Sequence, residues 1–81
     1  MFAEYTPTEK RGGSGRWRVM EWGHPEAGWH AFRTITEART LAREMVTGYG
    51  TPTMIVDART GLQRERWVRG SGGRAVSVKP A

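Results

Sequence analysis

The residue types with the clearest chemical potential in this chain are arginine and tryptophan, which recur together on two predicted strands, 16–22 and 62–69. A guanidinium binds phosphate through a planar fork of donors, and an indole ring can stack on unpaired bases. The pattern therefore predicts a contact face for nucleic acid, or for a protein partner with the same preference for arginine and tryptophan. The candidate contact residues are Arg16, Arg18, Trp22, Arg64, Arg66, Trp67 and Arg69.

Segments rich in glycine, serine and proline flank these strands. Residues 1–15 and 70–81 carry too little apolar surface to offset the entropy of ordering them, so we expect flexible tails. Arg11 and Arg74 lie in the runs RGGSG and RGSGGR, which resemble arginine–glycine segments that bind RNA without a fixed structure. Ordinary flexible linkers have a similar composition, so both readings of the tails stay open.

Groups suited to catalysis or metal binding are sparse. His24, Glu26 and His30 combine three possible metal ligands, but a turn containing proline gives them no defined geometry. The chain has no cysteine, and turn formation explains its sole aspartate, Asp57. The glycine-rich run 12–15 has neither the lysine nor the following helix of a phosphate-binding loop. We therefore expect a binding protein without catalytic activity, cofactor or metal.

The elements that must position the arginines follow a β-β-α-β-β order. Alternating or continuous apolar runs separated by turn residues predict two antiparallel hairpins. Residues 75–78 are a candidate for a short extra strand within the predicted C-terminal tail. The four principal predicted strands span residues 16–22, 29–33, 53–56 and 62–69.

A helix between the hairpins has the most distinct signature. Thr34 and Glu37 match a capping box, in which each side chain bonds to the other residue's backbone N–H. Gly48, Gly50 and Pro52 favour the end of the helix near residue 50. Apolar residues recur at helical spacing and predict one buried face. They are Ile35, Ala38, Leu41, Ala42, Met45 and Val46.

Length and charge limit the possible architectures. The chain has 81 residues, with 13 Lys+Arg against 8 Asp+Glu and a formal charge of +5, which favours anionic partners. Such a length suits one small α+β domain, which we place at residues 16–69. No apolar stretch approaches the roughly 20 residues of a membrane span, and the start lacks an apolar leader, so we expect a cytoplasmic location and no membrane partner. Arginine outnumbers lysine, a pattern that a GC-rich bacterial or phage genome would also produce.

One helix can cover only one face of a four-stranded sheet. The other face must be solvated, bind DNA or RNA, contact a host protein, or pair with a second copy in a homodimer. We expect Trp17 and Trp29 in the core, whereas Trp22 and Trp67 suit either the core or a contact surface.

The chain resembles a family of small bacterial and phage proteins with a β-β-α-β-β layout and no established activity. The shared features are a Trp-x-Val element, a Phe-x-Thr element before a Glu-Ala pair, an acidic-to-glycine turn and an Arg-Glu-Arg strand. The resemblance covers about 50 residues and implies the fold rather than a function; here the chain adds Gly/Arg tails and extra tryptophan. The features read Trp17-Arg18-Val19, Phe32-Arg33-Thr34, Glu37-Ala38, Asp57 to Gly61 and Arg64-Glu65-Arg66.

Overall fold

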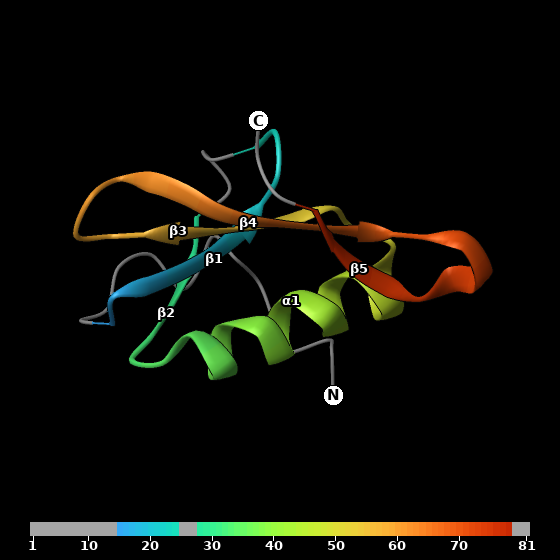
Figure 1. Ribbon diagram of the computed structural model, residues 1–81, viewed down its shortest axis with the longest axis horizontal. Helices are drawn as coiled ribbons and strands as arrows, with labels where there is room; N and C mark the ends of the chain where they lie inside the picture. Colours follow the sequence, from blue (N-terminus) through green and yellow to red (C-terminus); the bar gives the residue numbers. More distant parts are fainter. Residues whose placement is uncertain (1–14, 25–27, 79–81) are drawn as a thin grey trace.

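A computed structural model describes residues 15–24 and 28–78 of the chain. Within these residues, five antiparallel strands form one sheet, and one helix packs against one of its faces (Figure 1). The α+β class and the β-β-α-β-β order predicted from the sequence are confirmed. The elements are β1 (Trp17–Glu21), β2 (His30–Phe32), α1 (Ile35–Tyr49), β3 (Thr53–Asp57), β4 (Leu62–Arg69), a 3-10 turn (Ser71–Gly73) and β5 (Ala75–Val78).

The sheet order is β2-β1-β3-β4-β5, with β3 at the centre. Each predicted hairpin forms, and the antiparallel pairing of β1 with β3 joins the two hairpins into one sheet. In this pairing Val19 lies opposite Ile55, and both side chains are fully buried. The apolar run that predicted β3 therefore forms the middle strand of the sheet.

Local signals in the sequence determine both ends of α1. Thr34 is the N-cap, and its hydroxyl accepts a hydrogen bond from the backbone N–H of Glu37 at 3.2 Å, as the capping box predicts. Gly50 adopts φ 69°, a left-handed conformation that glycine takes without a steric penalty, and ends the helix. No helix in the described ranges is both long and apolar enough to cross a membrane.

The core lies between α1 and the covered face of the sheet. Small residues of the helix, Ala38 and Ala42, let its backbone approach the strands closely, and both are fully buried. Leu41, which we predicted on the buried helical face, lies only at the margin of this core. The buried cluster consists of Val19, Ala38, Ala42, Met45, Val46, Ile55 and Trp67.

The C-terminal region differs from the prediction of a flexible tail at 70–81. Residues 70–74 turn the chain back, and β5 pairs with β4 so that Val76 lies opposite Val68. Ala75 packs against the core, which adds apolar burial that composition alone did not indicate. The described domain therefore extends to Val78, and the candidate strand at 75–78 forms.

The central position of Ile55 leads to a stability prediction. Ile55→Ala removes side-chain volume at a fully buried position of the middle strand, and we expect the free energy of unfolding to fall by about 2–5 kcal/mol in urea denaturation. The control is Leu62→Ala, since Leu62 is 65% exposed and its truncation should change stability by about 0.5 kcal/mol or less. Equal losses in the two variants would contradict this placement of the core.

Candidate binding face

A β-bulge in β4 divides the predicted contact residues between the two faces of the sheet. Glu65 lies opposite Ile55 and Gln63 opposite Val56, so Arg64 has no partner residue on β3. The guanidinium of Arg64 lies 6.0 Å from the ring centre of Trp17, on the side that α1 covers. Simple alternation placed Arg64 and Arg66 on one face, and the bulge separates them because it adds a residue to one strand only.

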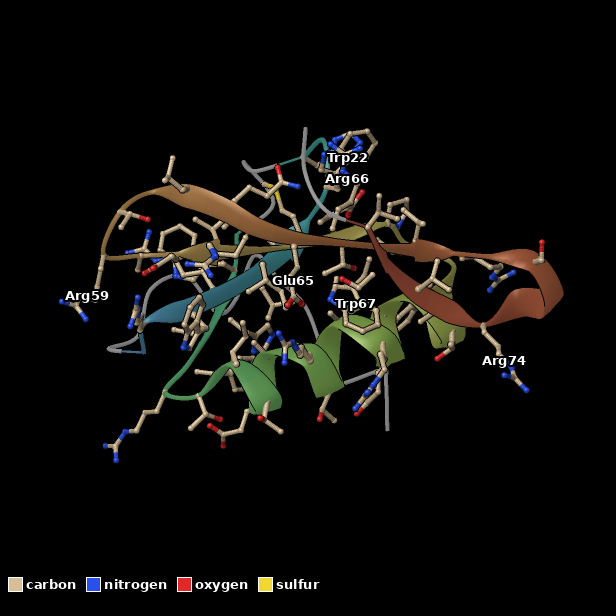
Figure 2. The ribbon with its side chains drawn as sticks, in the orientation of Figure 1. Trp22, Arg59, Glu65, Arg66, Trp67 and Arg74 are labelled. Atoms are coloured by element: carbon tan, nitrogen blue, oxygen red, sulfur yellow. The ribbon has the colours of Figure 1, made fainter. Side chains whose placement is uncertain are left out.

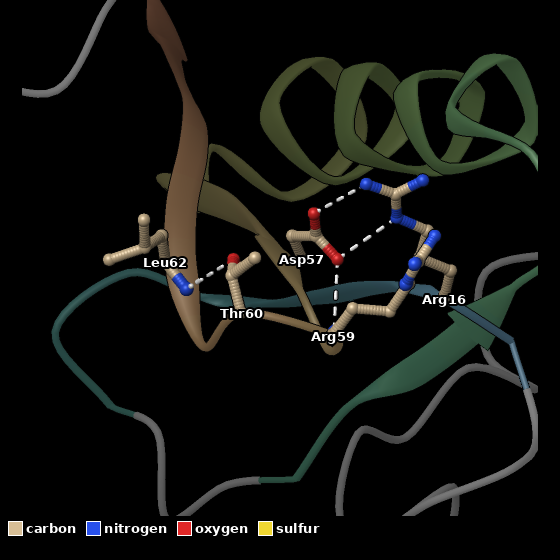
Figure 3. A network of polar contacts seen from close by, with 5 residues as sticks. All are labelled: Arg16, Asp57, Arg59, Thr60 and Leu62. Carbon is tan, nitrogen blue, oxygen red and sulfur yellow. Dashed lines mark hydrogen bonds and ion pairs between the residues drawn. The ribbon is translucent and has the colours of Figure 1, made fainter.

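Arg16 forms part of a polar network at one end of the sheet (Figure 3). Its Nε and Nη2 donate to the two carboxylate oxygens of Asp57 at 3.0 and 2.8 Å. The backbone N–H of Arg59 donates to the same carboxylate at 2.9 Å. The hydrogen bonds from Arg16 are the main cause that lowers the pKa of Asp57 to about 2, against the opposing effect of burial. Arg16 is therefore paired with a carboxylate within the fold, although its side chain is still 39% exposed.

Trp67 and Arg69 also lie on the covered side of the sheet. Trp67 is 8% exposed and belongs to the core, where its indole N–H donates to Glu65 at 3.0 Å. Arg39 of α1 donates to the same carboxylate and lowers the pKa of Glu65, an effect that burial opposes. Arg69 donates to the carbonyl of Val46 at 3.4 Å, near the end of α1 that lacks a basic residue of its own. Trp67 thus packs in the core, whereas Arg69 stays exposed and contacts the end of α1 through one hydrogen bond.

Two arginine–tryptophan stacks lie on the opposite face, which we call the open face; Figure 2 labels the residues of one of them, Trp22 and Arg66. The guanidinium of Arg66 lies 4.1 Å from the ring centre of Trp22, and that of Arg18 lies 4.6 Å from Trp29. Trp29 was predicted in the core, but its ring packs with Arg18 instead. Trp29 directly precedes β2, where Phe32 packs against the core, and alternation along the chain turns Trp29 to the other face. The strand pairings and the alternation of side chains place these residues on the open face: Arg18, Met20, Trp22, Trp29, Met54, Val56, Gln63, Arg66, Val68, Val76 and Val78.

The open face also holds several hydrogen-bond donors that have no acceptor in the described part of the chain. Four of its side-chain nitrogens are buried and lack a described hydrogen-bond partner: Nε of Arg18, Nε1 of Trp29, Nε2 of Gln63 and Nε of Arg66. All four can donate a proton and belong to residues of the open face. A buried donor without an acceptor costs about 1–3 kcal/mol. A ligand rich in acceptors would remove this cost if the side chains moved to meet it.

Acidic residues are segregated from the open face within the described part of the chain. Asp57 and Glu65 bind arginines on the covered side, and Glu21 lies opposite buried Thr53 on that side too. Glu37 and Glu44 belong to α1. No ion pair in the described ranges joins Arg18 or Arg66 to an acid. Among the described residues, therefore, no neighbouring carboxylate compensates the charge of the two open-face guanidiniums.

A hollow of about 330 Å³ lies on the other side of the molecule, between β2 and α1. Its apolar walls come from Phe32 and Leu41, and Glu37 and Glu44 line it together with Thr40. Sequence reasoning did not identify it, because it depends on where β2 crosses the end of the helix. The two carboxylates make this hollow unsuitable for a phosphate.

Of the two tail candidates, Arg74 lies away from both stacks. Arg74 is exposed at the turn before β5, at the far end of the domain (Figure 2), and Arg11 lies outside the described residues. The described residues contain no cluster of three or more side chains suited to holding a metal ion, and Glu26 is outside these ranges. Of the predicted contact residues on the two strands, Arg18, Trp22 and Arg66 share the open face.

The Arg16–Asp57 pair predicts a particular acid response. Because folding lowers the pKa of Asp57 from 3.8 to about 2, its ionised form stabilises the fold above pH 4, and this contribution disappears as the pH falls toward 2. We expect Asp57→Asn to lower the melting temperature at pH 7 and to make its decline between pH 5 and pH 2 shallower.

The matched control is Glu44→Gln, which removes a carboxylate from the exposed side of α1. This variant should keep the steep acid decline of the parent protein. A decline in Asp57→Asn as steep as that of the parent would show that this pair does not stabilise the fold.

No family model, curated protein or solved structure matches this chain. The resemblance to small bacterial and phage proteins therefore stays an expectation from sequence motifs. What the open face can bind follows from its own residues: two guanidiniums, two indoles and the apolar side chains between them.

Proposed function

We propose that this protein binds nucleic acid through the open face and has no catalytic role. The observation that carries the proposal is the segregation of charge: Arg18 and Arg66 lie beside exposed aromatic surface, with no described acid on that face. The formal charge of +5 strengthens attraction to a polyanion over longer distances.

Phosphate is the ligand group that suits the open-face arginines. Each guanidinium presents several N–H donors in one plane, and a phosphate offers matching acceptor oxygens. The Nε atoms of Arg18 and Arg66 have no acceptor among the described residues, so a phosphate would supply a hydrogen bond that this part of the fold leaves unmade. Phosphate contacts release counterions, and binding should therefore weaken steeply as salt increases.

The tryptophans favour unpaired bases over a closed duplex. Trp22 is 40% exposed, and Arg66 already stacks on its ring at a distance that suits a cation–π contact. An exposed contact of this kind is worth about 0.5–1 kcal/mol, whereas stacking of a base on an aromatic ring is worth about 1–3 kcal/mol. A base can thus displace Arg66 from the ring, and the released guanidinium can bind the adjacent phosphate.

A protein partner is the alternative occupant of the open face. Tryptophan and arginine are also common in the energetic centre of protein interfaces, and Val76 and Val78 add exposed apolar area. An interface centred on apolar contacts responds little to salt, whereas phosphate binding responds strongly. Salt dependence therefore separates the two functions, and a host protein or a second copy becomes the candidate if nucleic acid does not bind.

The first test removes charge from the open face. We expect the double variant Arg18→Gln/Arg66→Gln to lose about tenfold or more in affinity for single-stranded DNA or RNA at about 50 mM salt. The measurement is fluorescence anisotropy with short labelled oligonucleotides, repeated at about 200 mM salt and with duplexes of the same sequence. The decrease in affinity with salt should also become smaller in this variant, because two phosphate contacts are lost.

The matched control is Arg33→Gln/Arg59→Gln, which makes the same change in net charge at exposed sites outside the open face. If both double variants lose affinity equally, the attraction depends on net charge alone and the open face is not the site. Failure of the parent protein to bind any of the oligonucleotides at low salt would reject nucleic-acid binding altogether.

A second test addresses stacking. Trp22→Ala should weaken binding to single strands by about 5- to 150-fold, the equivalent of about 1–3 kcal/mol, and should affect duplex binding less. The control Tyr49→Ala removes another exposed aromatic ring, at the end of α1. An equal loss for single strands and duplexes would indicate that the tryptophan supports the fold of the face and does not stack on bases.

A further inference from the structure

The outer edge of β5 carries backbone groups that no strand pairs with in the described part of the chain. The backbone N–H of Gly70 donates to the carbonyl of Arg74 at 2.7 Å, which sets the alternation of hydrogen-bonded pairs along the hairpin. By this alternation Val76 and Val78 direct their backbone groups toward β4. The N–H and C=O groups of Ala75 and Ser77 therefore point outward.

The side chains of β5 leave this edge accessible. Natural proteins usually block an edge strand with charge, proline or a bulge, and none of these occurs within Ala75–Val78. Val76 and Val78 are 40% and 43% exposed, and they lie on the open face beside the edge. The opposite edge of the sheet, β2, is only three residues long and offers less backbone for pairing.

We propose that the β5 edge pairs antiparallel with β5 of a second copy of this chain. A two-fold axis between the two copies places their Ser77 residues opposite each other. The backbone N–H of each Ser77 then donates to the carbonyl of the other. In this register Val76 of each copy lies opposite Val78 of the other, and the narrower non-hydrogen-bonded spacing brings the valines into contact.

A second copy suits this edge better than a nucleic acid does. Ala75–Val78 has no charge, so two identical strands can approach without repulsion between their side chains, whereas nothing in the strand attracts phosphate. Pairing would cover the exposed valines of both copies at once. It would also join the two sheets into a continuous surface with both open faces on one side.

The dimer can be tested at Ser77 because its backbone N–H points outward, away from β4. Ser77→Pro removes this outward donor without removing a hydrogen bond to β4, and proline is tolerated on edge strands in this position. Ser77→Ala keeps the donor and serves as the control. Sedimentation velocity from about 1 µM to 1 mM should show a dimer with a dissociation constant of about 10–100 µM for the parent protein and for Ser77→Ala.

We expect Ser77→Pro to weaken dimerisation at least tenfold while its circular dichroism spectrum stays that of the parent. If that variant unfolds, Val76→Lys replaces it, with Val76→Thr as control, because a lysine beside the edge opposes close pairing without altering the backbone. A parent protein that is monomeric up to about 1 mM, or a folded Ser77→Pro that dimerises like the parent, would overturn the proposal. Sedimentation is performed without nucleic acid, so its outcome is independent of the oligonucleotide titrations.

Discussion

The architecture depends on one constraint: a single helix buries one face of the sheet and leaves the other without cover. Ala38 and Ala42 bring α1 close to Val19 and Ile55, so the apolar contacts of a small chain are concentrated in one layer. Every other feature of the domain follows from this asymmetry. Side chains on the covered face must pack or find polar partners within the domain, whereas polar side chains on the open face can also find partners in a ligand.

Two carboxylates of the covered face, those of Asp57 and Glu65, obtain their hydrogen-bond partners from specific arginine, tryptophan and backbone donors. Asp57 is fully buried and accepts hydrogen bonds from both Arg16 and a backbone N–H, and Glu65 accepts from Arg39 and Trp67. A buried carboxylate without such partners would be strongly destabilising. These pairs tie β1 to β3 and α1 to β4, so arginines that look like ligand contacts in the sequence stabilise the sheet instead.

The open face has a different balance. Arg18 and Arg66 are held over tryptophan rings rather than by carboxylates, and cation–π contacts are weaker than buried ion-paired hydrogen bonds. Such contacts hold the guanidiniums in position, but a stronger hydrogen-bond acceptor on a ligand can replace the tryptophan ring as their partner. This is the physical basis for preferring the open face as a ligand surface. On the covered side, Arg16 and Arg39 have carboxylate partners, Arg69 donates to the carbonyl of Val46, and Arg64 lies near Trp17.

The sequence by itself determined the elements, because their signals are local. A capping box at Thr34, helical spacing of apolar residues and a glycine stop specify α1, and alternating runs with turn residues specify the hairpins. Only the tertiary structure decided the strand order, the addition of β5 and the faces of Arg64, Trp29 and Trp67. These features depend on pairing between distant segments: the bulge beside Arg64 arises where β4 meets β3, and one extra residue there reverses the side to which the side chain points.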